Sequence, residues 1–155
     1  MHDSMTLEKA AQLPMKESTG PASTSEQPVV LLVEDDTEMR RFVSQALHAA
    51  GFRVVEYSTG QRIRSDIDAA FFYDHIAWVP DLVVSDIRLP GSSGMDILKR
   101  IRQAKLDVPV IMMTGFGSKA VVSQAERFGA LRVFNKPFDI KDLVELATEV
   151  AFAKR

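Results

Sequence analysis

From Val29 to the end of the chain, short runs of apolar residues alternate with longer segments in which apolar residues recur every three or four positions. A continuous apolar run of about five residues is typical of a strand that is buried on both faces of a sheet. The spacing of three or four is typical of a helix that lays one face on a core. The first pattern predicts strands at residues 29–33, 53–57, 81–86, 108–114 and 131–135.

The second pattern predicts helices that alternate with these strands. They cover residues 37–50, most of 60–79, a segment that begins near Ser93, residues 118–128 and a last segment that follows Asp139. Ser118 and Asp139 have short polar side chains that favour the cap position before a helix. Gly51 and Gly129 follow helical segments and are typical of helix ends.

Alternation of strands and helices indicates an α/β fold with a doubly wound, five-stranded parallel sheet and helices on both faces. In such open sheets, ligands bind beside the carboxyl ends of the strands. The candidate functional residues are therefore those that end or follow each predicted strand.

The chain has 155 residues, a length typical of one domain with a tail. Residues 1–27 include the stretch KESTGPASTSEQP, which is rich in Ser, Thr, Gly and Pro and poor in apolar residues. This composition predicts a flexible N-terminal tail, with the folded domain at residues 28–155.

Composition then narrows the classes of function. A formal net charge of −2 gives no general attraction to nucleic acid, and the absence of cysteine excludes disulfides, thiolate metal sites and cysteine nucleophiles. No apolar run has the length of a membrane span, and the N-terminus lacks the pattern of a signal peptide. We therefore expect a cytoplasmic protein that contacts neither nucleic acid nor a membrane directly.

Charged and polar residues stand at the ends of four predicted strands. Glu34 and Asp35 follow the first, Asp86 ends the third, Thr114 ends the fourth, and Lys136 follows the fifth. Each residue alone has an ordinary explanation as a loop or surface residue. Brought to one edge of a sheet, however, the three acids would repel one another without a cation. Ligands that are all oxygen favour a hard ion, and we expect Mg²⁺.

The stretches LLVEDD, VVSDIRLPGSSG, MMTG and NKPF stand in this order along the chain. They resemble the four signature stretches of the response regulator receiver domains of two-component signalling, and the resemblance extends from Val29 to Phe152. It implies the strand order 2-1-3-4-5. It also implies a protein that accepts a phosphoryl group from a sensor histidine kinase or a histidine phosphotransfer protein.

The resemblance implies a role for each acid at the strand ends. Asp86 matches the carboxylate that accepts the phosphoryl group. Asp35 matches the direct Mg²⁺ ligand, and Glu34 matches an acid that acts mainly through water. The backbone carbonyl of Arg88 matches a further metal ligand.

Thr114 and Lys136 match the hydroxyl and the ammonium that hold the phosphoryl oxygens. Fixed positive potential at these oxygens favours phosphoryl transfer, because charge is spread over them in the transition state. The bond between Lys136 and Pro137 matches one that is cis in the family. We expect the acids that pair with Lys136 to lie at an exposed edge, where a salt bridge adds little to stability.

On this interpretation the chain is a stand-alone receiver that signals through contact with a downstream protein or by relaying the phosphoryl group. It would catalyse only its own phosphorylation and dephosphorylation. Two alternatives stay open, namely a receiver that binds partners without phosphorylation and the receiver part of a longer DNA-binding regulator. A flavin carrier is disfavoured because acids stand where a flavin phosphate would bind, and a haloacid-dehalogenase-type phosphatase because Arg88 stands where its second Asp would be.

Two departures from the family pattern bear on signalling. Val133 stands where the family usually has Tyr or Phe, whose ring takes part in the switch. Phe134 lies next to it, but alternation along a strand points its side chain to the other face. Phe116 is another aromatic residue close to the site. Either the switch is altered or carried elsewhere, or it works through the loop after Thr114.

The segment between Gly60 and Asp81 is also longer than is usual in the family. It concentrates aromatic residues at positions 71–78, among them Phe72, Tyr73 and Trp78. Core packing or an enlarged helix is one explanation. The other is a surface for a partner or for a second copy of the chain, which would make a homodimer.

Overall fold

The computed structural model describes residues 27–72 and 79–153. In chain order, its strands and helices are β1 (Val29–Val33), α2 (Thr37–Ala49), β2 (Arg53–Tyr57), α3 (Gly60–Phe72), β3 (Leu82–Asp86), α4 (Gly94–Gln103), β4 (Val110–Thr114), α5 (Lys119–Arg127), β5 (Arg132–Asn135) and α6 (Ile140–Phe152). Strands and helices alternate, as the hydrophobic pattern predicts.

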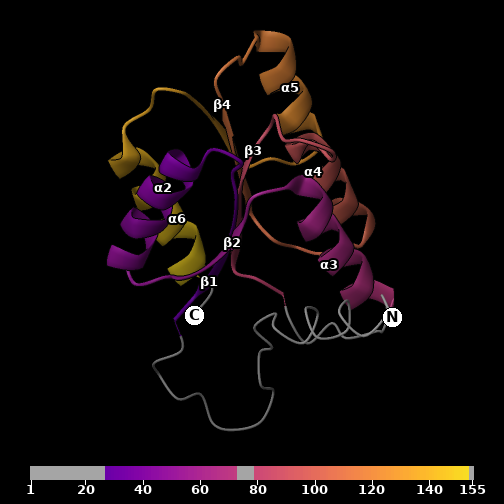
Figure 1. Ribbon diagram of the computed structural model, residues 1–155, viewed down its shortest axis with the longest axis horizontal. Coiled ribbons are helices and arrows are strands. Elements are labelled where there is room, and N and C mark those ends of the chain that lie inside the picture. Colours follow the sequence, from indigo (N-terminus) through magenta and orange to yellow (C-terminus); the bar gives the residue numbers. More distant parts are fainter. Residues whose placement is uncertain (1–26, 73–78, 154–155) are drawn as a thin grey trace, which may run out of the picture.

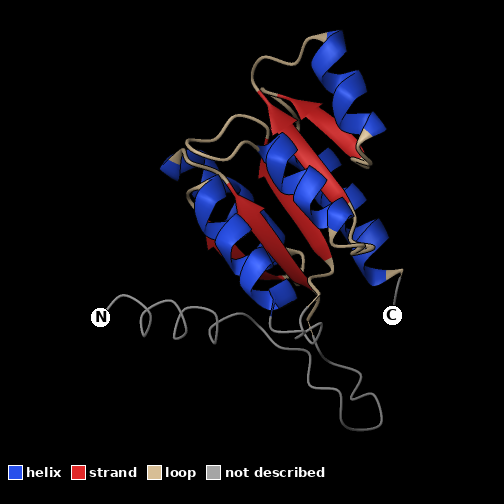
Figure 2. Ribbon diagram, turned by 90° about the vertical axis from the view of Figure 1, so that its right-hand side faces the viewer, coloured by secondary structure: helices blue, strands red, loops and turns tan. Residues whose placement is uncertain are grey.

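The strands of the described residues form one sheet in the order β2-β1-β3-β4-β5, and every pair of neighbours is parallel. Helices α2 and α6 cover one face of the sheet, and α3, α4 and α5 cover the other (Figures 1 and 2). The predicted fold and strand order are therefore confirmed. Because all strands run the same way, their carboxyl ends share one edge of the sheet.

The core consists of two apolar layers, one on each face of the sheet. Leu31 of β1 belongs to the layer under α3, α4 and α5, whereas Leu32 belongs to the layer under α2 and α6. Neither side chain is more than 1% exposed. This two-sided burial explains why the strand sequences are continuously apolar, and each such side chain contributes roughly 2 kcal/mol on burial.

Short polar side chains begin the helices, as the sequence predicts. Ser118 accepts the Val121 N–H before α5, and Asp139 accepts the Lys141 N–H before α6. Ser93 forms a reciprocal capping box with Asp96 at the start of α4. These caps fix where each helix leaves the edge that carries the strand ends.

Three predicted strands start one or two residues too early, and polar chemistry explains two of these differences. The third is β5, which begins at Arg132 rather than at residue 131. β4 begins at Val110 rather than at residue 108, because Pro109 has no N–H to give to the ladder. Pro109 contributes only its carbonyl, which accepts the Val83 N–H at 3.0 Å. β3 begins at Leu82 because the carboxylate of Asp81 accepts the backbone N–H of Val29 at 2.8 Å.

Some predictions lie outside the described residues. The predicted tail at residues 1–27 falls almost wholly there, as do Tyr73 and Trp78. For Phe72 the structure gives the backbone as the end of α3. Among the helices that the structure describes, none combines the length and the apolar character needed to cross a bilayer.

Candidate functional site

The register of the sheet brings the end of β1 level with the end of β3. Val33 lies opposite Ser85, so Glu34 leaves β1 where Asp86 ends β3. β4 and β5 end nearby, with Thr114 paired to Asn135 immediately before Lys136. Residues that are far apart in the sequence therefore meet at one edge, as the alternation of strands and helices predicts.

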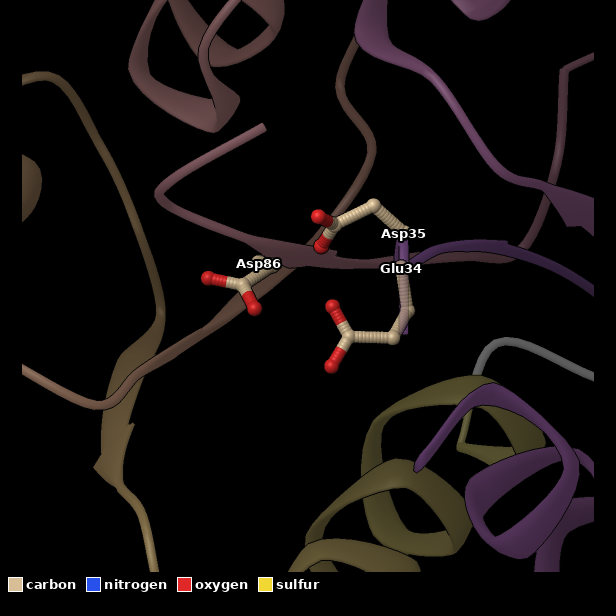
Figure 3. A group of neighbouring side chains, drawn as sticks. All are labelled: Glu34, Asp35 and Asp86. Carbon is tan, nitrogen blue, oxygen red and sulfur yellow. The ribbon is translucent and has the colours of Figure 1, made fainter. Parts of the chain in front are cut away.

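Three carboxylates face one another at this edge. One oxygen from each of Glu34, Asp35 and Asp86 lies within 4.8 Å of the others. Figure 3 shows Asp35 and Glu34 reaching from adjacent positions toward Asp86. The side chain of Asp35 is exposed, whereas Glu34 is 0% and Asp86 5% exposed. Three close negative charges in a partly dry setting repel one another and favour a bound cation.

Lys136 bridges the two buried acids. Its ammonium donates to Glu34 Oε1 at 2.7 Å and to Asp86 Oδ2 at 2.5 Å. Burial works against the charged form of Lys136, but hydrogen bonds from the ammonium to the two carboxylates outweigh burial and raise its pKa. The ammonium is therefore charged at physiological pH.

The prediction that the acids paired with Lys136 lie at an exposed edge is wrong. The Lys136 side chain is 25% exposed, but the side chains of Glu34 and Asp86 are 0% and 8% exposed. The ion pairs are therefore largely shielded from solvent, and removal of the lysine would leave two buried acids without their cationic partner.

The surroundings of Glu34 oppose the negative charge of its carboxyl. Burial and the neighbouring Asp86 together raise the pKa of its carboxyl to about 7, against the opposing effect of Lys136. Its second oxygen, Oε2, is buried and has no hydrogen-bond partner in the described part of the chain. An acidic oxygen without a donor, next to two other carboxylates, fits a hard cation such as Mg²⁺.

The backbone around Asp86 holds its carboxylate in place. The Arg88 N–H donates to Asp86 Oδ1 at 3.1 Å. The Gly94 N–H donates to the carbonyl of Ile87 at 2.8 Å, and a Cβ on Gly94 would stand 2.1 Å from the carbonyl oxygen of Asp86. Glycine is therefore required at position 94 by the close approach of α4 to the strand end.

Thr114 is 1% exposed, and its hydroxyl oxygen accepts the N–H of Phe116 at 3.2 Å. A hydroxyl that accepts one bond can still donate its own hydrogen to another group. The backbone carbonyl of Thr114 accepts the Lys136 N–H at 2.7 Å, which ties β4 to the residue that carries the ammonium. The bond between Lys136 and Pro137 is cis, as predicted.

Some contacts of the site were not predicted from the sequence. Arg40, one turn into α2, donates to the backbone carbonyl of Glu34 at 2.9 Å and fixes the start of the acidic pair. The Arg88 guanidinium lies over the ring of Phe116, 4.9 Å from its centre. Residue spacing gives no signal for these contacts, because each depends on where a long side chain folds back.

The aromatic residue of β5 lies on the face that strand alternation predicts. Phe134 is 5% exposed and belongs to the layer under α2 and α6, whereas Val133 packs in the opposite layer. The ring of Phe134 therefore cannot stand in for an aromatic residue at position 133.

Comparison with known proteins gives one consistent result. A family model described as the response regulator receiver domain matches residues 30–148. The C4-dicarboxylate transport transcriptional regulatory protein DctD of Pseudomonas aeruginosa is 38% identical over 127 residues, which are 80% of this chain and 26% of that protein. The response regulator receiver protein CpdR of Brucella abortus is 31% identical over 116 residues, which are 74% of this chain and 89% of that protein.

Solved structures agree with these relatives. The BeF3-activated DrrB receiver domain superposes with a TM-score of 0.68 at 25% identity, covering 84% of this chain and 100% of that chain. A CheY-like receiver domain protein from Methanospirillum hungatei superposes with a TM-score of 0.69 at 24% identity, covering 83% of this chain and 97% of that chain. This likeness supports the fold. The chain spans about a quarter of the length of DctD and of the NtrC regulators that it matches.

Proposed function

Since the chain belongs to the response regulator receiver family, we propose that Asp86 accepts a phosphoryl group in the presence of Mg²⁺. The observation that carries the proposal is the position of Asp86. It is a carboxylate fixed at a strand end, with the Lys136 ammonium on one oxygen and the Arg88 N–H on the other. A nucleophilic carboxylate needs both a fixed position and nearby positive charge.

The proposed donor is a phosphohistidine of a sensor histidine kinase or of a histidine phosphotransfer protein. An oxygen of Asp86 attacks phosphorus, and a new O–P bond forms as the P–N bond to the imidazole breaks. The imidazole nitrogen keeps the electron pair of that bond and takes up a proton. The product is an acyl phosphate on Asp86.

The side chains around Asp86 would follow the developing charge. Lys136 can pass from the Asp86 carboxylate to a phosphoryl oxygen with little movement, because its ammonium already lies 2.5 Å from the attacked side chain. The Thr114 hydroxyl keeps a hydrogen to donate to a second phosphoryl oxygen. Both interactions place positive potential where charge is spread in the transition state.

Asp35 and Glu34 are the side chains proposed to hold Mg²⁺, together with Asp86 and the backbone carbonyl of Arg88. The exposed carboxylate of Asp35 is accessible to a metal ion as a direct ligand. Glu34, whose buried Oε2 has no hydrogen-bond partner among the described residues, is proposed to act mainly through a water molecule on the metal. A bound Mg²⁺ would neutralise the acids and draw charge from the phosphoryl oxygens.

We propose that the phosphorylated domain signals through contact with a downstream protein or by relay, in the cytoplasm, and turns over no other substrate. This interpretation is favoured by the similarity to CpdR, a receiver protein of which this chain matches 89% of the length. DctD is a transcriptional regulatory protein of which the chain matches 26%, and it favours the alternative of a receiver within a longer DNA-binding regulator.

Intact-mass measurement tests the proposal. The protein is incubated with acetyl phosphate and Mg²⁺, with an EDTA-treated sample and the Asp86→Asn variant beside it. We expect one phosphoryl group on the wild type with Mg²⁺ and none in the two controls. Equal incorporation in the wild type and in Asp86→Asn would refute the assignment. A wild type that took up no phosphoryl group would favour the alternative of a receiver that binds partners without phosphorylation.

A further inference from the structure

The loop that follows β4, residues 115–118, is held at three points by the ends of three strands. The Phe116 N–H donates to the hydroxyl of Thr114 on β4. A Cβ on Gly117 would stand 2.2 Å from the side-chain oxygen of Asn135 on β5, so the loop backbone lies directly on that side chain. The third point is the Phe116 ring, which lies under the guanidinium of Arg88 beyond β3.

Arg88 is the residue that links this loop to the proposed phosphate acceptor. Its backbone N–H donates to Asp86 Oδ1, and its guanidinium lies over the ring of Phe116. Phe116 is 72% exposed, so little apolar packing fixes its position. The cation–π contact and the hydrogen bond to Thr114 are therefore the contacts that tie Phe116 to the strand ends, whereas the bond from the Ser118 N–H to the Phe116 carbonyl, at 3.1 Å, lies within the loop.

The loop is also the place where a state of Asp86 can be transmitted. Position 133, on β5, holds a valine that packs into the core, and the neighbouring Phe134 is buried on the opposite face. Neither side chain offers an aromatic ring that could turn toward Thr114. Phe116, in contrast, is an exposed aromatic residue with a direct bond to the Thr114 hydroxyl.

We propose that the contact between Arg88 and Phe116 is a latch that is closed in the unphosphorylated protein and opens when Asp86 carries a phosphoryl group. The proposal rests on the proposed phosphorylation of Asp86. A phosphoryl group offers two charged oxygens that the guanidinium can bind through two parallel N–H···O bonds, and such bonds are stronger than a cation–π contact at an exposed site. Arg88 therefore leaves the ring.

Movement of the Thr114 hydroxyl also favours release of Phe116. When it turns to donate to a phosphoryl oxygen, its bond with the Phe116 N–H lengthens or breaks. Phe116 then loses both contacts that tie it to the strand ends, and the exposed ring moves with the loop. The latch thereby links the chemistry at Asp86 to a change at the surface, without an aromatic residue on β5.

The latch has a measurable cost for phosphorylation, because it stabilises the unphosphorylated state. Beryllofluoride with Mg²⁺ imitates a phosphoryl group on a carboxylate, and its apparent affinity can be titrated by the rise in melting temperature. We expect Phe116→Leu to bind beryllofluoride about threefold more tightly than the wild type, the factor that loss of an exposed cation–π contact implies. In an Arg88→Ala background, Phe116→Leu should have no further effect.

Phe128 supplies a matched control, because its ring lies under the Lys99 ammonium at 4.6 Å and is also exposed. Phe128→Leu removes a contact of the same kind at the far end of α5 and should leave the affinity unchanged. If Phe116→Leu binds like the wild type and like Phe128→Leu, the latch is wrong while the proposed function stands. If the wild type fails to bind beryllofluoride at Asp86, both proposals fall.

A fluorescent reporter tests the movement itself. The chain contains a single tryptophan, Trp78. In a Trp78→Phe background, Phe116→Trp places an indole where it can stack on Arg88. Its emission should shift when beryllofluoride and Mg²⁺ are added, and the shift should be absent with Mg²⁺ alone. An emission spectrum that stays constant while beryllofluoride binds would overturn the latch.

Discussion

Glu34→Gln should stabilise the metal-free protein at pH 8, although the residue belongs to the proposed metal site. Glu34 is 0% exposed, and its Oε2 has no hydrogen-bond partner among the described residues. Burial and the nearby Asp86 raise the pKa of its carboxyl from 4.5 to about 7, against the opposing effect of Lys136. Glutamine has nearly the same shape, carries no charge and still offers an oxygen to Lys136.

The sign of the effect follows from the raised pKa. The folded state keeps the proton of Glu34 at pH values where the unfolded chain has lost it. The stability that this proton contributes is complete below about pH 4.5 and is lost as pH rises through about 7. A change of this size, which already includes the opposing effect of Lys136, corresponds to about 3 kcal/mol. The amide NH₂ of glutamine would be a buried donor, and the cost of leaving it partly unsatisfied reduces the net gain of the variant to about 1–2 kcal/mol.

Thermal unfolding in EDTA at pH 5 and pH 8 measures this effect. We expect the variant and the wild type to melt within about 2 °C of each other at pH 5, and the variant to melt about 3–6 °C higher at pH 8. Glu145→Gln changes an exposed glutamate on α6 and is the matched control, without a pH-dependent difference. Saturating Mg²⁺ should raise the melting temperature of the wild type more than that of Glu34→Gln.

A constant difference between Glu34→Gln and the wild type from pH 5 to pH 8 would refute the reasoning, because it would show that Glu34 does not titrate in this range. A variant that melts lower at pH 8 would show that the negative charge is needed by Lys136 more than it is opposed by burial.

Three further changes test other parts of the site. Asp35→Ala removes an exposed carboxylate of the acidic group, so the rise in melting temperature with Mg²⁺ should largely vanish; an unchanged rise would place the metal elsewhere. Lys136→Ala leaves two buried acids unpaired and should lower the free energy of unfolding of the metal-free protein by about 3 kcal/mol, measured by urea unfolding at pH 8. A loss below about 1 kcal/mol would contradict the burial of these ion pairs. Gly94→Ala forces a Cβ against the backbone of Asp86, so it should lower the free energy of unfolding by about 2 kcal/mol and slow phosphorylation by acetyl phosphate. Unchanged stability would mean that α4 can move away from the strand end.

Much of this architecture is available from the sequence because its causes are local. A run such as VVLLV is apolar on both faces only if both faces are covered, so it predicts a central strand of a parallel sheet. Once the strands are placed, parallel direction alone brings Glu34, Asp86 and Lys136 to one edge. The convergence of the site therefore follows from the order of elements and needs no knowledge of distances.

The remaining features depend on packing between distant segments. The sequence shows two adjacent acids, but it does not show that Glu34 is buried while Asp35 is exposed, because this depends on how the chain turns from β1 into α2. Nor does it show why position 94 holds glycine, which the structure explains by a close approach to the backbone of Asp86. The contact between Arg88 and Phe116 joins two loops through side chains and has no periodic signal.

The most direct test of the account is to locate the phosphoryl group chemically. Borohydride reduces an aspartyl phosphate to homoserine, which marks the acceptor permanently and can be found by peptide mass mapping. The wild type is treated with acetyl phosphate and Mg²⁺, reduced and digested. We predict homoserine at position 86 alone. Homoserine at position 35, or a phosphoryl group that survives reduction on a serine or threonine, would contradict the assignment of Asp86 as the acceptor.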